Sequence, residues 1–512
     1  MLTMMTETRN PLSRRGTSER PNARTPEREL GRLARDLARI VGPDGVVSDP
    51  DALTVYERDA LTYLSEYPPQ IVALPRSTEE VAAVARRCAE AGVPITPRGA
   101  GTGLAGGAVA ARGGVLIGLN RMDRIRSVDL ANRQAEVEAG LVNLWLTNAV
   151  RERGYFFAPD PSSQAASTIG GNIGNNAGGA HCLKYGMTVG HVLGLEVVLA
   201  DGRVVHLGGA APDPPGYDLA GVFVGSEGTF GVATAASVRL LPQPEGVKTM
   251  LAVFESVQDA SNAVADITAE GIIPAALEMI DKHIIRAVEE VVKAGYPQDA
   301  EVVLLIELDG PWAEIEAQAD AVLRICRRTN VIEVRVAKDE GERARLWKGR
   351  KEAAGAVGRI TPTYYLQDCV IRRTLLPRIL GEIDAIGARH GVKIANVFHA
   401  GDGNLHPLIC FDERVPGELE RAVAAGSEIL RLCIAVGGTV TGEHGVGQEK
   451  MNFMPLMYSE ADLAAMLKVR NAFNPENRCN PGKIFPTAKT CGEVGIAYRP
   501  HPIEQQGLAV RL

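Results

Sequence analysis

The chain has 512 residues, and its 55 lysines and arginines against 62 aspartates and glutamates give a formal net charge of −7. This mildly acidic balance excludes a protein that binds nucleic acid through bulk positive charge, and a hydrophobic content of 45% excludes a disordered chain. At roughly 100–200 residues per domain, the length predicts two to four domains. No stretch approaches the ~18–20 consecutive apolar residues of a membrane helix. We therefore expect a multidomain soluble enzyme.

The two dozen residues at the start are rich in Arg, Thr, Ser and Pro, and they lack the apolar core of a secretory signal. They predict a disordered tail and a cytoplasmic protein; a transit peptide, or a start at Met4 or Met5, stays an alternative. The eight cysteines form no C-x-x-C pair, so neither a disulfide framework nor an iron–sulfur cluster is indicated. If the protein carries out redox chemistry, electrons must leave through an organic cofactor and an external acceptor.

The predicted elements begin with a helix, since Leu30, Leu33 and Leu37 recur at helical spacing. A short apolar run at 71–74, a capped helix over 81–90 and extended character at 95–96 then predict a βαβ unit. Farther along, strands are expected at 115–119 and 135–139, a helix at 144–153, a hairpin over 193–207 that turns at Asp201-Gly202, and alternating strands and helices over 247–335. This alternation, with few turn glycines, suits a second α+β domain.

Glycine is concentrated in three segments of the first half, residues 97–103, 168–179 and 225–231. The first follows a predicted strand and presents backbone N–H groups with no side chains in the way, as a pyrophosphate requires. Gly101 also begins a G-x-G-x-x-G pattern, but no helical period follows, so the dinucleotide fold of that fingerprint is not indicated. Asparagines among the glycines of the second segment need hydrogen-bond partners. A glycine-rich turn without a ligand is the alternative for any single segment.

These three segments, with residues 159–163 ahead of the second, resemble the FAD-binding domain of the vanillyl-alcohol-oxidase (PCMH-type) flavoproteins. The likeness runs from about Leu30 to Gly482 and is strongest to the subgroup of the FAD-linked glycolate oxidase subunit and the D-lactate and D-2-hydroxyglutarate dehydrogenases. It implies an α+β fold, with a PCMH-type FAD-binding domain, an α+β substrate (cap) domain with an antiparallel sheet, and a C-terminal segment that returns to the FAD domain. The expected boundaries are a tail at 1–27, the FAD domain at 28–245, the cap domain at 246–440, the returning segment at 441–490 and a tail at 491–512.

The same resemblance implies that FAD is bound non-covalently. Some proteins of this fold attach FAD through His or Cys, and His181-Cys182 raises that alternative, although a bound histidine or buried thiol is the expected role. The residues that would hold FAD are Pro97, Arg98, Gly99, Ala100, Gly101, Thr102, Gly103, Pro161, Ser162, Thr168, Gly170, Gly171, Asn172, Asn176, Gly178, Gly179, Glu227, Gly228, Gly231, Val232 and Asn480.

Two histidines flank a turn in the second half of the chain. If residues 401–404 form a four-residue hairpin loop, His399 lies directly opposite His406, with Cβ atoms ~4.5–5.5 Å apart on one face. Glu443 is a third candidate ligand, and two His with one carboxylate leave open positions on a metal. The alternatives are packed histidines and a helix-entry loop. The resemblance implies that His399, His406 and Glu443 bind a divalent metal, for which zinc is expected, and that His444 is the catalytic base.

A small 2-hydroxy acid also needs a carboxylate clamp, which a planar guanidinium supplies better than an ammonium does. Arg350 matches the substrate-carboxylate arginine of the resembled family, and a solvated basic helix face is the alternative. Further carboxylate-binding Thr, Lys and Asn residues of the family are replaced here around Ala354, Leu366 and Leu408. These departures favour glycolate or D-lactate over D-2-hydroxyglutarate.

The sequence thus predicts metal-assisted oxidation of a 2-hydroxy acid to the 2-oxo acid, with hydride transfer to flavin N5 and electrons passed to a partner. The resemblance implies an iron–sulfur companion subunit or another acceptor, with any membrane association made through that partner. The alternatives are another 2-hydroxy acid as substrate, a non-redox flavoenzyme similar to the ether-lipid synthase, a metal hydrolase, and a non-catalytic subunit.

Overall fold

The structure is a computed structural model that describes residues 27–61, 68–211 and 215–486. The expected tails at 1–27 and 491–512 lie outside the described residues, apart from residue 27. Within the described residues, no helix combines the length and the apolar character that a bilayer crossing needs.

A small sheet and two helices open the fold. Its elements are α1 (Glu27–Val41), β1 (Val46–Val47), α2 (Pro50–Leu53), β2 (Ile71–Ala73), α3 (Thr78–Glu90), β3 (Ile95–Arg98) and β4 (Val115–Gly118). Leu33 and Leu37 of α1 pack with α3 on this sheet, as their spacing predicts. The predicted βαβ unit of β2, α3 and β3 is present, with both strands parallel to β4, but the strand order β1-β2-β4-β3 places β4 between the two strands that α3 connects.

A second, antiparallel sheet has the order β5-β6-β10-β8-β9 and packs on short helices. The hairpin of β8 and β9 is confirmed, with Gly202 at a positive φ of 82° in its turn. The elements are β5 (Ile125–Asp129), β6 (Gln134–Glu138), α4 (Asn143–Arg151), β7 (Tyr155–Phe156), α5 (Ile169–Asn175), α6 (Cys182–Tyr185), β8 (Val192–Val198), β9 (Val204–Gly208), α7 (Leu219–Phe223), β10 (Val232–Arg239) and β11 (Leu241–Pro242).

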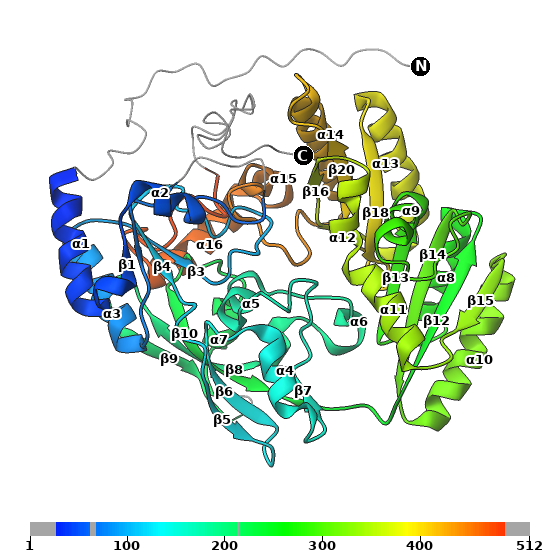
Figure 1. Ribbon diagram of the computed structural model, residues 1–512, viewed down its shortest axis with the longest axis horizontal. Coiled ribbons are helices and arrows are strands. Elements are labelled where there is room, and N and C mark those ends of the chain that lie inside the picture. Colours follow the sequence, from blue (N-terminus) through cyan, green and yellow to red (C-terminus); the bar gives the residue numbers. More distant parts are fainter. Residues whose placement is uncertain (1–26, 62–67, 212–214, 487–512) are drawn as a thin grey trace.

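The remaining strands form one large sheet with helices on both faces (Figure 1). Its strands and helices are β12 (Gly246–Phe254), α8 (Val257–Ala269), β13 (Ala276–Asp281), α9 (Lys282–Val291), β14 (Val302–Gly310), α10 (Trp312–Arg328), β15 (Glu333–Val336), α11 (Glu340–Lys351), α12 (Ala353–Ala356), β16 (Thr363–Leu366), β17 (Cys369–Val370), α13 (Leu376–His390), β18 (Lys393–His399), β19 (Asn404–Leu405), β20 (Pro407–Phe411) and α14 (Glu418–Ala435). The strand order is β15-β12-β14-β13-β18-β19-β17, and β20 joins β18 to β16.

Alternation along β12 shows why both faces of this sheet are covered. Met250 and Phe254 pack in one hydrophobic core with α8, α10, α13 and α14, whereas Leu251 and Val253 pack in the other with α9, α11 and α12. Successive strand residues point to opposite faces, so an unbroken apolar strand needs two cores. The sheet therefore holds the strand ends that carry the two candidate ligand histidines on a rigid support.

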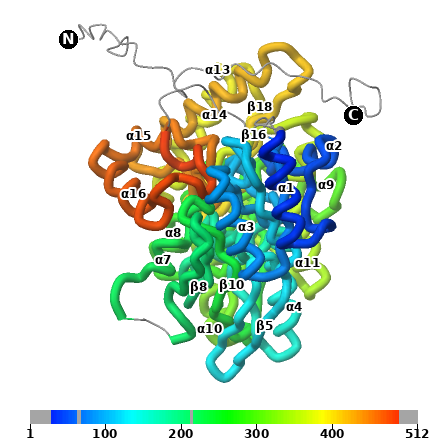
Figure 2. Tube along the Cα trace, turned by 90° about the vertical axis from the view of Figure 1, so that its left-hand side faces the viewer, coloured from blue at the N-terminus to red at the C-terminus, as the bar shows by residue number. Residues whose placement is uncertain are grey.

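The chain then returns to the first sheet through α15 (Met454–Met457) and α16 (Glu460–Phe473). After α16, Cys479 bridges Ile95 of β3 in parallel, and the Asn480 backbone N–H donates to the Ile95 carbonyl over 2.7 Å. Figure 2 faces this side of the molecule and shows α15 and α16 in the same view as α1 and α3. The last part of the described chain is thus joined to β3 of the first sheet.

Candidate active site

The three glycine segments converge on one cavity. Sixteen of the residues predicted to hold FAD lie on its wall. They are Pro97, Arg98, Gly99, Ala100, Gly101, Thr102, Gly103, Pro161, Ser162, Thr168, Gly170, Gly171, Asn172, Glu227, Gly228 and Gly231.

The walls of this cavity are largely backbone. A Cβ placed on Gly99 would overlap the Thr168 hydroxyl, so only glycine lets the first and second segments approach this closely. Part of the second segment is the helix α5 rather than a loop, because the Thr168 hydroxyl accepts from the Gly171 N–H and caps it, and Ile169 and Ile173 bury one face. The result is a cleft lined largely by the three glycine segments, which suits the predicted FAD site.

Five predicted cofactor residues lie behind this wall. Asn480 donates from Nδ2 to the carbonyl oxygens of Gly107 and Glu227, at 2.8 and 2.7 Å, and so ties two wall segments together. Asn176 accepts from Val189 N–H, Val232 begins β10, and Gly178 and Gly179 back onto Glu443 and Asp160. Further wall residues, most of them within or next to the glycine segments, are Leu104, Gly107, Ala108, Leu119, Ser163, Ser167, Gly174, Asn175, Ala177, Phe223 and Ala233.

His181 lies away from the cavity wall, between two carboxylates. Its Nδ1 is 2.8 Å from Asp160 Oδ2, its Nε2 is 3.3 Å from Glu307 Oε1, and its ring stacks on Trp347. Both ring nitrogens are therefore engaged, which leaves none for a covalent bond to flavin. Burial and the nearby Glu443 carboxylate raise the pKa of the Cys182 thiol, so this thiol is also a poor nucleophile.

The two histidines predicted as metal ligands do meet, with a register that differs from the predicted one. His399 faces Asn404, and Asn396 faces Pro407, so His399 and His406 are not directly opposite. The shift is two residues along the ladder, and a two-residue shift keeps side chains on the same face. The imidazole centroids therefore still lie 5.1 Å apart.

Glu443 completes this group from the turn after α14. Its Oε1 lies 3.2 Å from His399 Nε2 and 3.3 Å from His406 Nε2. His399 Nδ1 lies 2.9 Å from Glu278 Oε1, whereas neither His406 nitrogen has a hydrogen bond among the described residues. Burial opposes protonation of His399, but Glu278 and Glu443 outweigh it and raise its pKa to about 10. This group attracts positive charge, and its donor set fits a divalent metal.

His444 connects this cluster with the flavin cavity, because Glu443 and His444 both lie on the cavity wall. The His444 ring stacks on that of His406 at 4.9 Å, and its carbonyl accepts from Asn175 Nδ2 at 3.0 Å. Burial lowers the pKa of His444 to about 4. A neutral imidazole at the junction of cavity and cluster is suited to accept a proton.

Arg350 is buried on the far side of His399. Its Nε donates to Glu278 Oε2 at 2.6 Å, and its Nη2 lies 3.4 Å from His399 Nδ1. The structure thus brings Arg350 to the candidate metal cluster, though it is not on the wall of the cavity.

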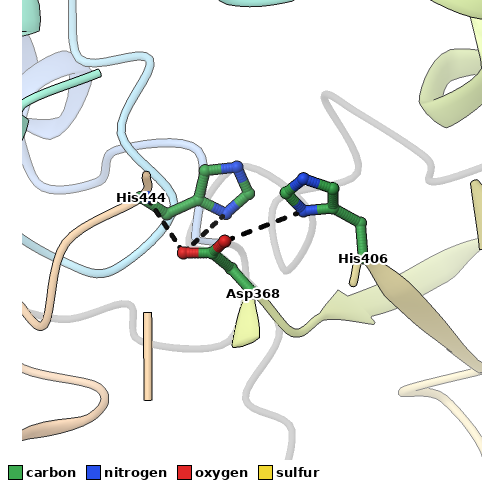
Figure 3. Close-up of side chains that lie close together, drawn as sticks. All are labelled: Asp368, His406 and His444. Carbon is green, nitrogen blue, oxygen red and sulfur yellow. Dashed lines mark hydrogen bonds and ion pairs between the residues drawn. The ribbon is translucent and has the colours of Figure 1, made fainter. Parts of the chain in front are cut away.

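Asp368, which the sequence analysis did not single out, lies beside His406 and His444 (Figure 3). It follows β16 in a stretch without a recognisable motif, so no local signal connects it with ligands farther along the chain. Its position becomes visible only when β16 pairs with β20.

Comparison with known proteins gives the family. Residues 69–208 match the model of the FAD binding domain, and residues 243–484 match that of the FAD linked oxidases, C-terminal domain. The chain is 45% identical over 456 residues to the glycolate oxidase subunit GlcD of Escherichia coli K12, covering 89% of this chain and 91% of that protein. The D-lactate dehydrogenase of Anaerostipes hadrus is 30% identical, over 87% of this chain and 95% of that one.

Solved structures with the same fold are more distant in sequence. p-Cresol methylhydroxylase aligns with a TM-score of 0.75 and 17% identity, over 90% of this chain and 98% of that one. Alkyldihydroxyacetonephosphate synthase aligns with a TM-score of 0.69 and 18% identity, over 90% and 85%. These similarities confirm the predicted PCMH-type α+β fold. With the family models and the GlcD relatives, they show that the chain belongs to the FAD-linked oxidases and is an FAD-dependent oxidoreductase.

Proposed function

We propose that the protein oxidises a small 2-hydroxy acid, glycolate or D-lactate, to the 2-oxo acid. The observation that carries this proposal is that Glu443 and His444 lie on the wall of the FAD cavity while Glu443 also contacts both His399 and His406. A base, a candidate metal and a flavin would thereby share one substrate. The names of the GlcD and D-lactate dehydrogenase relatives support this class of substrate.

The position of each residue suggests its role in the reaction. FAD, when bound, supplies a two-electron acceptor, and a divalent metal held by His399, His406 and Glu443 supplies a Lewis acid. His444 accepts the hydroxyl proton of the substrate, because burial keeps its ring neutral. Arg350 binds the substrate carboxylate with the N–H groups that do not already donate to Glu278.

Apolar packing next to His406 favours a small substrate. Leu408 is fully buried two residues beyond His406, pairs with Leu366 across the sheet, and packs in the same core as Ala354. A second carboxylate on the substrate would have to be buried there without a partner, at a cost that neutral apolar groups do not incur. We therefore place glycolate and D-lactate ahead of D-2-hydroxyglutarate.

The electrons would leave through a partner protein. The seven cysteines within the described residues are all free, and the chain has no C-x-x-C pair with which to hold a cluster. We propose an iron–sulfur companion subunit or another external acceptor, and zinc as the metal.

An anaerobic visible spectrum of the FAD-loaded protein tests the reaction. Glycolate, D-lactate, L-lactate and D-2-hydroxyglutarate are titrated separately, with and without EDTA. We expect one small acid to bleach the flavin band, and EDTA to slow the bleaching. A flavin that no hydroxy acid reduces would contradict the reaction, and bleaching that EDTA leaves unchanged would contradict the metal alone.

Replacement of His444 tests the base. His444→Ala should lower kcat by roughly 10²–10⁴-fold with FAD still bound, because proton transfer by a positioned base contributes about that factor. The measurement is single-turnover flavin reduction, with the exposed His206→Ala as control. Unchanged reduction in His444→Ala would remove this residue from the mechanism.

A further inference from the structure

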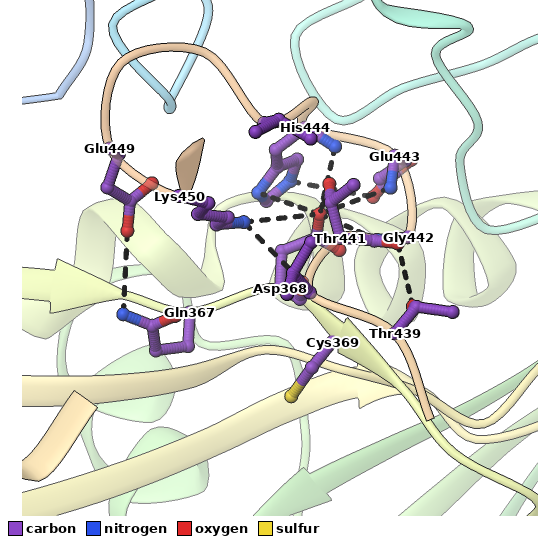
Figure 4. Close-up of polar contacts among 12 residues, drawn as sticks. Gln367, Asp368, Cys369, Thr439, Thr441, Gly442, Glu443, His444, Glu449 and Lys450 are labelled. Carbon is purple, nitrogen blue, oxygen red and sulfur yellow. Dashed lines mark hydrogen bonds and ion pairs between the residues drawn. The ribbon is translucent and has the colours of Figure 1, made fainter. Parts of the chain in front are cut away.

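Asp368 lies at the centre of the polar contacts around the candidate metal cluster (Figure 4). Its side chain is fully buried in the short connection between β16 and β17. A buried carboxylate is retained only where partners replace its hydration. The partners of its two oxygen atoms differ, and each set leads to a different part of the site.

Oδ2 of Asp368 holds the turn that carries Glu443 and His444. It accepts from Thr441 Oγ1 at 2.6 Å and from the backbone N–H groups of Gly442, Glu443 and His444, at 2.9, 3.2 and 3.0 Å. Residues 441–444 belong to no helix or strand. Four donors on one oxygen atom therefore fix a turn that regular hydrogen bonding does not.

Oδ1 of Asp368 faces His406. It lies 4.0 Å from His406 Nδ1, and neither atom has a hydrogen-bond partner among the described residues, although both are buried. His406 Nε2 points the other way, to Glu443. The arrangement resembles that of His399, whose Nδ1 lies 2.9 Å from Glu278 Oε1 and whose Nε2 faces Glu443, although Asp368 lies farther from His406. A carboxylate behind a metal-ligating histidine fixes the tautomer that offers Nε2 to the metal.

Lys450 decides between this role and a second metal site. Asp368, His406 and His444 could themselves hold a cation. However, the buried Lys450 Nζ already lies 3.6 Å from Asp368 Oδ2, and that oxygen atom has four further donors. A second cation beside the ammonium group would be repelled. We therefore interpret Asp368, His406 and His444 as a support for the proposed metal at His399, His406 and Glu443, and not as a second metal site.

We propose that Asp368 is a positioning residue that orients two metal ligands and the base together: His406 through Oδ1, and Glu443 and His444 through Oδ2. This inference rests on the metal site of the proposed function. It predicts that one carboxylate controls metal affinity and the placement of His444, without itself contacting the metal or the substrate.

The test replaces Asp368 with asparagine, which has nearly the same shape. In one orientation of the asparagine side chain, its NH₂ group faces the donors of the turn and cannot accept their hydrogen bonds. In the other orientation, the NH₂ group donates to His406 Nδ1. The imidazole proton is then on Nε2, which blocks metal ligation by that atom. We expect Zn²⁺ affinity to fall roughly 10–100-fold, the usual effect of losing such a partner. At saturating Zn²⁺, kcat should stay below wild type with KM little changed, since His444 is displaced and the substrate contacts remain.

Zn²⁺ affinity is measured on FAD-loaded protein by competition with a chromophoric chelator, beside FAD content and melting temperature. Asp281→Asn is the matched control, because Asp281 likewise accepts three backbone N–H groups, those of His283, Ile284 and Asn396. Its Zn²⁺ affinity should equal that of wild type. If Asp368→Asn does not fold, Thr441→Val removes one donor from Oδ2 and should weaken Zn²⁺ binding several-fold.

The outcomes separate the two proposals. Wild-type Zn²⁺ affinity in the folded Asp368→Asn variant, or in Thr441→Val if that variant stands in, would overturn the role of Asp368 and leave the metal site intact. A wild-type protein that binds no divalent metal would overturn both the role of Asp368 and the metal part of the proposed function, while substrate bleaching of the flavin would still report on the redox reaction.

Discussion

Gly447 shows how closely the catalytic turn packs against the first glycine segment. Its φ of 54° is left-handed, and a Cβ at this position would overlap the carbonyl oxygen of Ala105. That same oxygen atom accepts the backbone N–H groups of Gln448 and Glu449. The carboxylate of Glu227 meanwhile accepts from Val446 and Gly447, both at 2.7 Å. The turn that follows His444 is thus anchored to two walls of the FAD cavity.

Replacing Gly447 with alanine should therefore cost both stability and FAD affinity. The left-handed backbone costs about 1–2 kcal/mol for a residue with a Cβ, and the overlap adds roughly 1–3 kcal/mol as overpacking. Gly437→Ala is the control, because Gly437 has a φ of 78° but nothing within 4 Å of its Cβ position. Urea unfolding and FAD titration compare the two. Equal losses in both variants would show that crowding against Ala105 is unimportant.

At the same scale, His399 and His406 were predicted from their positions on either side of a glycine turn and Glu443 from a glycine-rich turn, whereas the role of His444 was implied by the family resemblance. Glu278 was not predicted, since it lies 121 positions before the histidine it contacts, on a strand with an ordinary apolar pattern. Partners of ligands become visible only when the sheet forms, and a single sequence does not carry that pairing.

Among the elements, α6 contributes to the link between the two halves. The segment from His181 to Tyr185 lies against β14 and α11: His181 and Trp347 both reach Glu307, and Lys184 and Tyr185 reach Asp309. Glu307 also accepts from Arg343. Since α11 carries Arg350 as well, the link orients the proposed substrate anchor relative to the flavin cavity.

His181→Asn should weaken this link in a pH-dependent way. Burial opposes the charged ring, but Asp160 and Glu307 outweigh it and raise the pKa of His181 to about 10. Because the pKa of His181 is higher in the folded than in the unfolded protein, the charged ring stabilises the fold fully below the unfolded pKa of about 6.5. This stabilisation is lost as the pH rises through the folded pKa of about 10. The variant should lose roughly 3–5 kcal/mol near pH 6 and progressively less toward pH 10.

Denaturant melts of wild type and His181→Asn from pH 6 to 10 provide the measurement. His206→Asn is the control, because His206 is an exposed histidine beside a carboxylate, 3.6 Å from Glu196. It should show neither the loss nor the pH trend. A difference between wild type and His181→Asn that is constant with pH would mean that the ring is uncharged.

Whether a segment forms a helix or a strand was easier to predict from sequence than which strands lie next to each other in a sheet. The helix α3, Thr78–Glu90, was predicted closely at 81–90, because apolar spacing and caps are local. The insertion of β4 between β2 and β3, and the register of His399, depend on contacts between distant segments. Local patterns carry no information about which strand completes a sheet.

On the scale of the whole molecule, one cavity wall is built from residues far apart in the chain. Parts of the segments 97–108, 161–177 and 223–233 line it together with Leu119, Glu443 and His444. A Cβ on Gly178 would lie 2.8 Å from both Glu443 Oε2 and Cys182 Sγ, so the second glycine segment backs directly onto a proposed metal ligand. FAD and the metal would thus order overlapping sets of residues.

FAD and metal binding should therefore favour each other. If the first ligand orders the turn at 443–447, the second ligand does not have to bear the entropy cost of ordering it. We therefore expect each ligand to raise the affinity for the other by roughly 5–150-fold. Thermodynamic linkage requires the two factors to be equal.

Zn²⁺ affinity is measured in flavin-free and FAD-loaded protein, and FAD affinity with and without Zn²⁺. Glu227→Gln, which weakens the acceptors for Val446 and Gly447, should reduce both factors together. Zn²⁺ affinities that are equal in the two forms would mean that the cavity wall and the metal cluster are ordered independently.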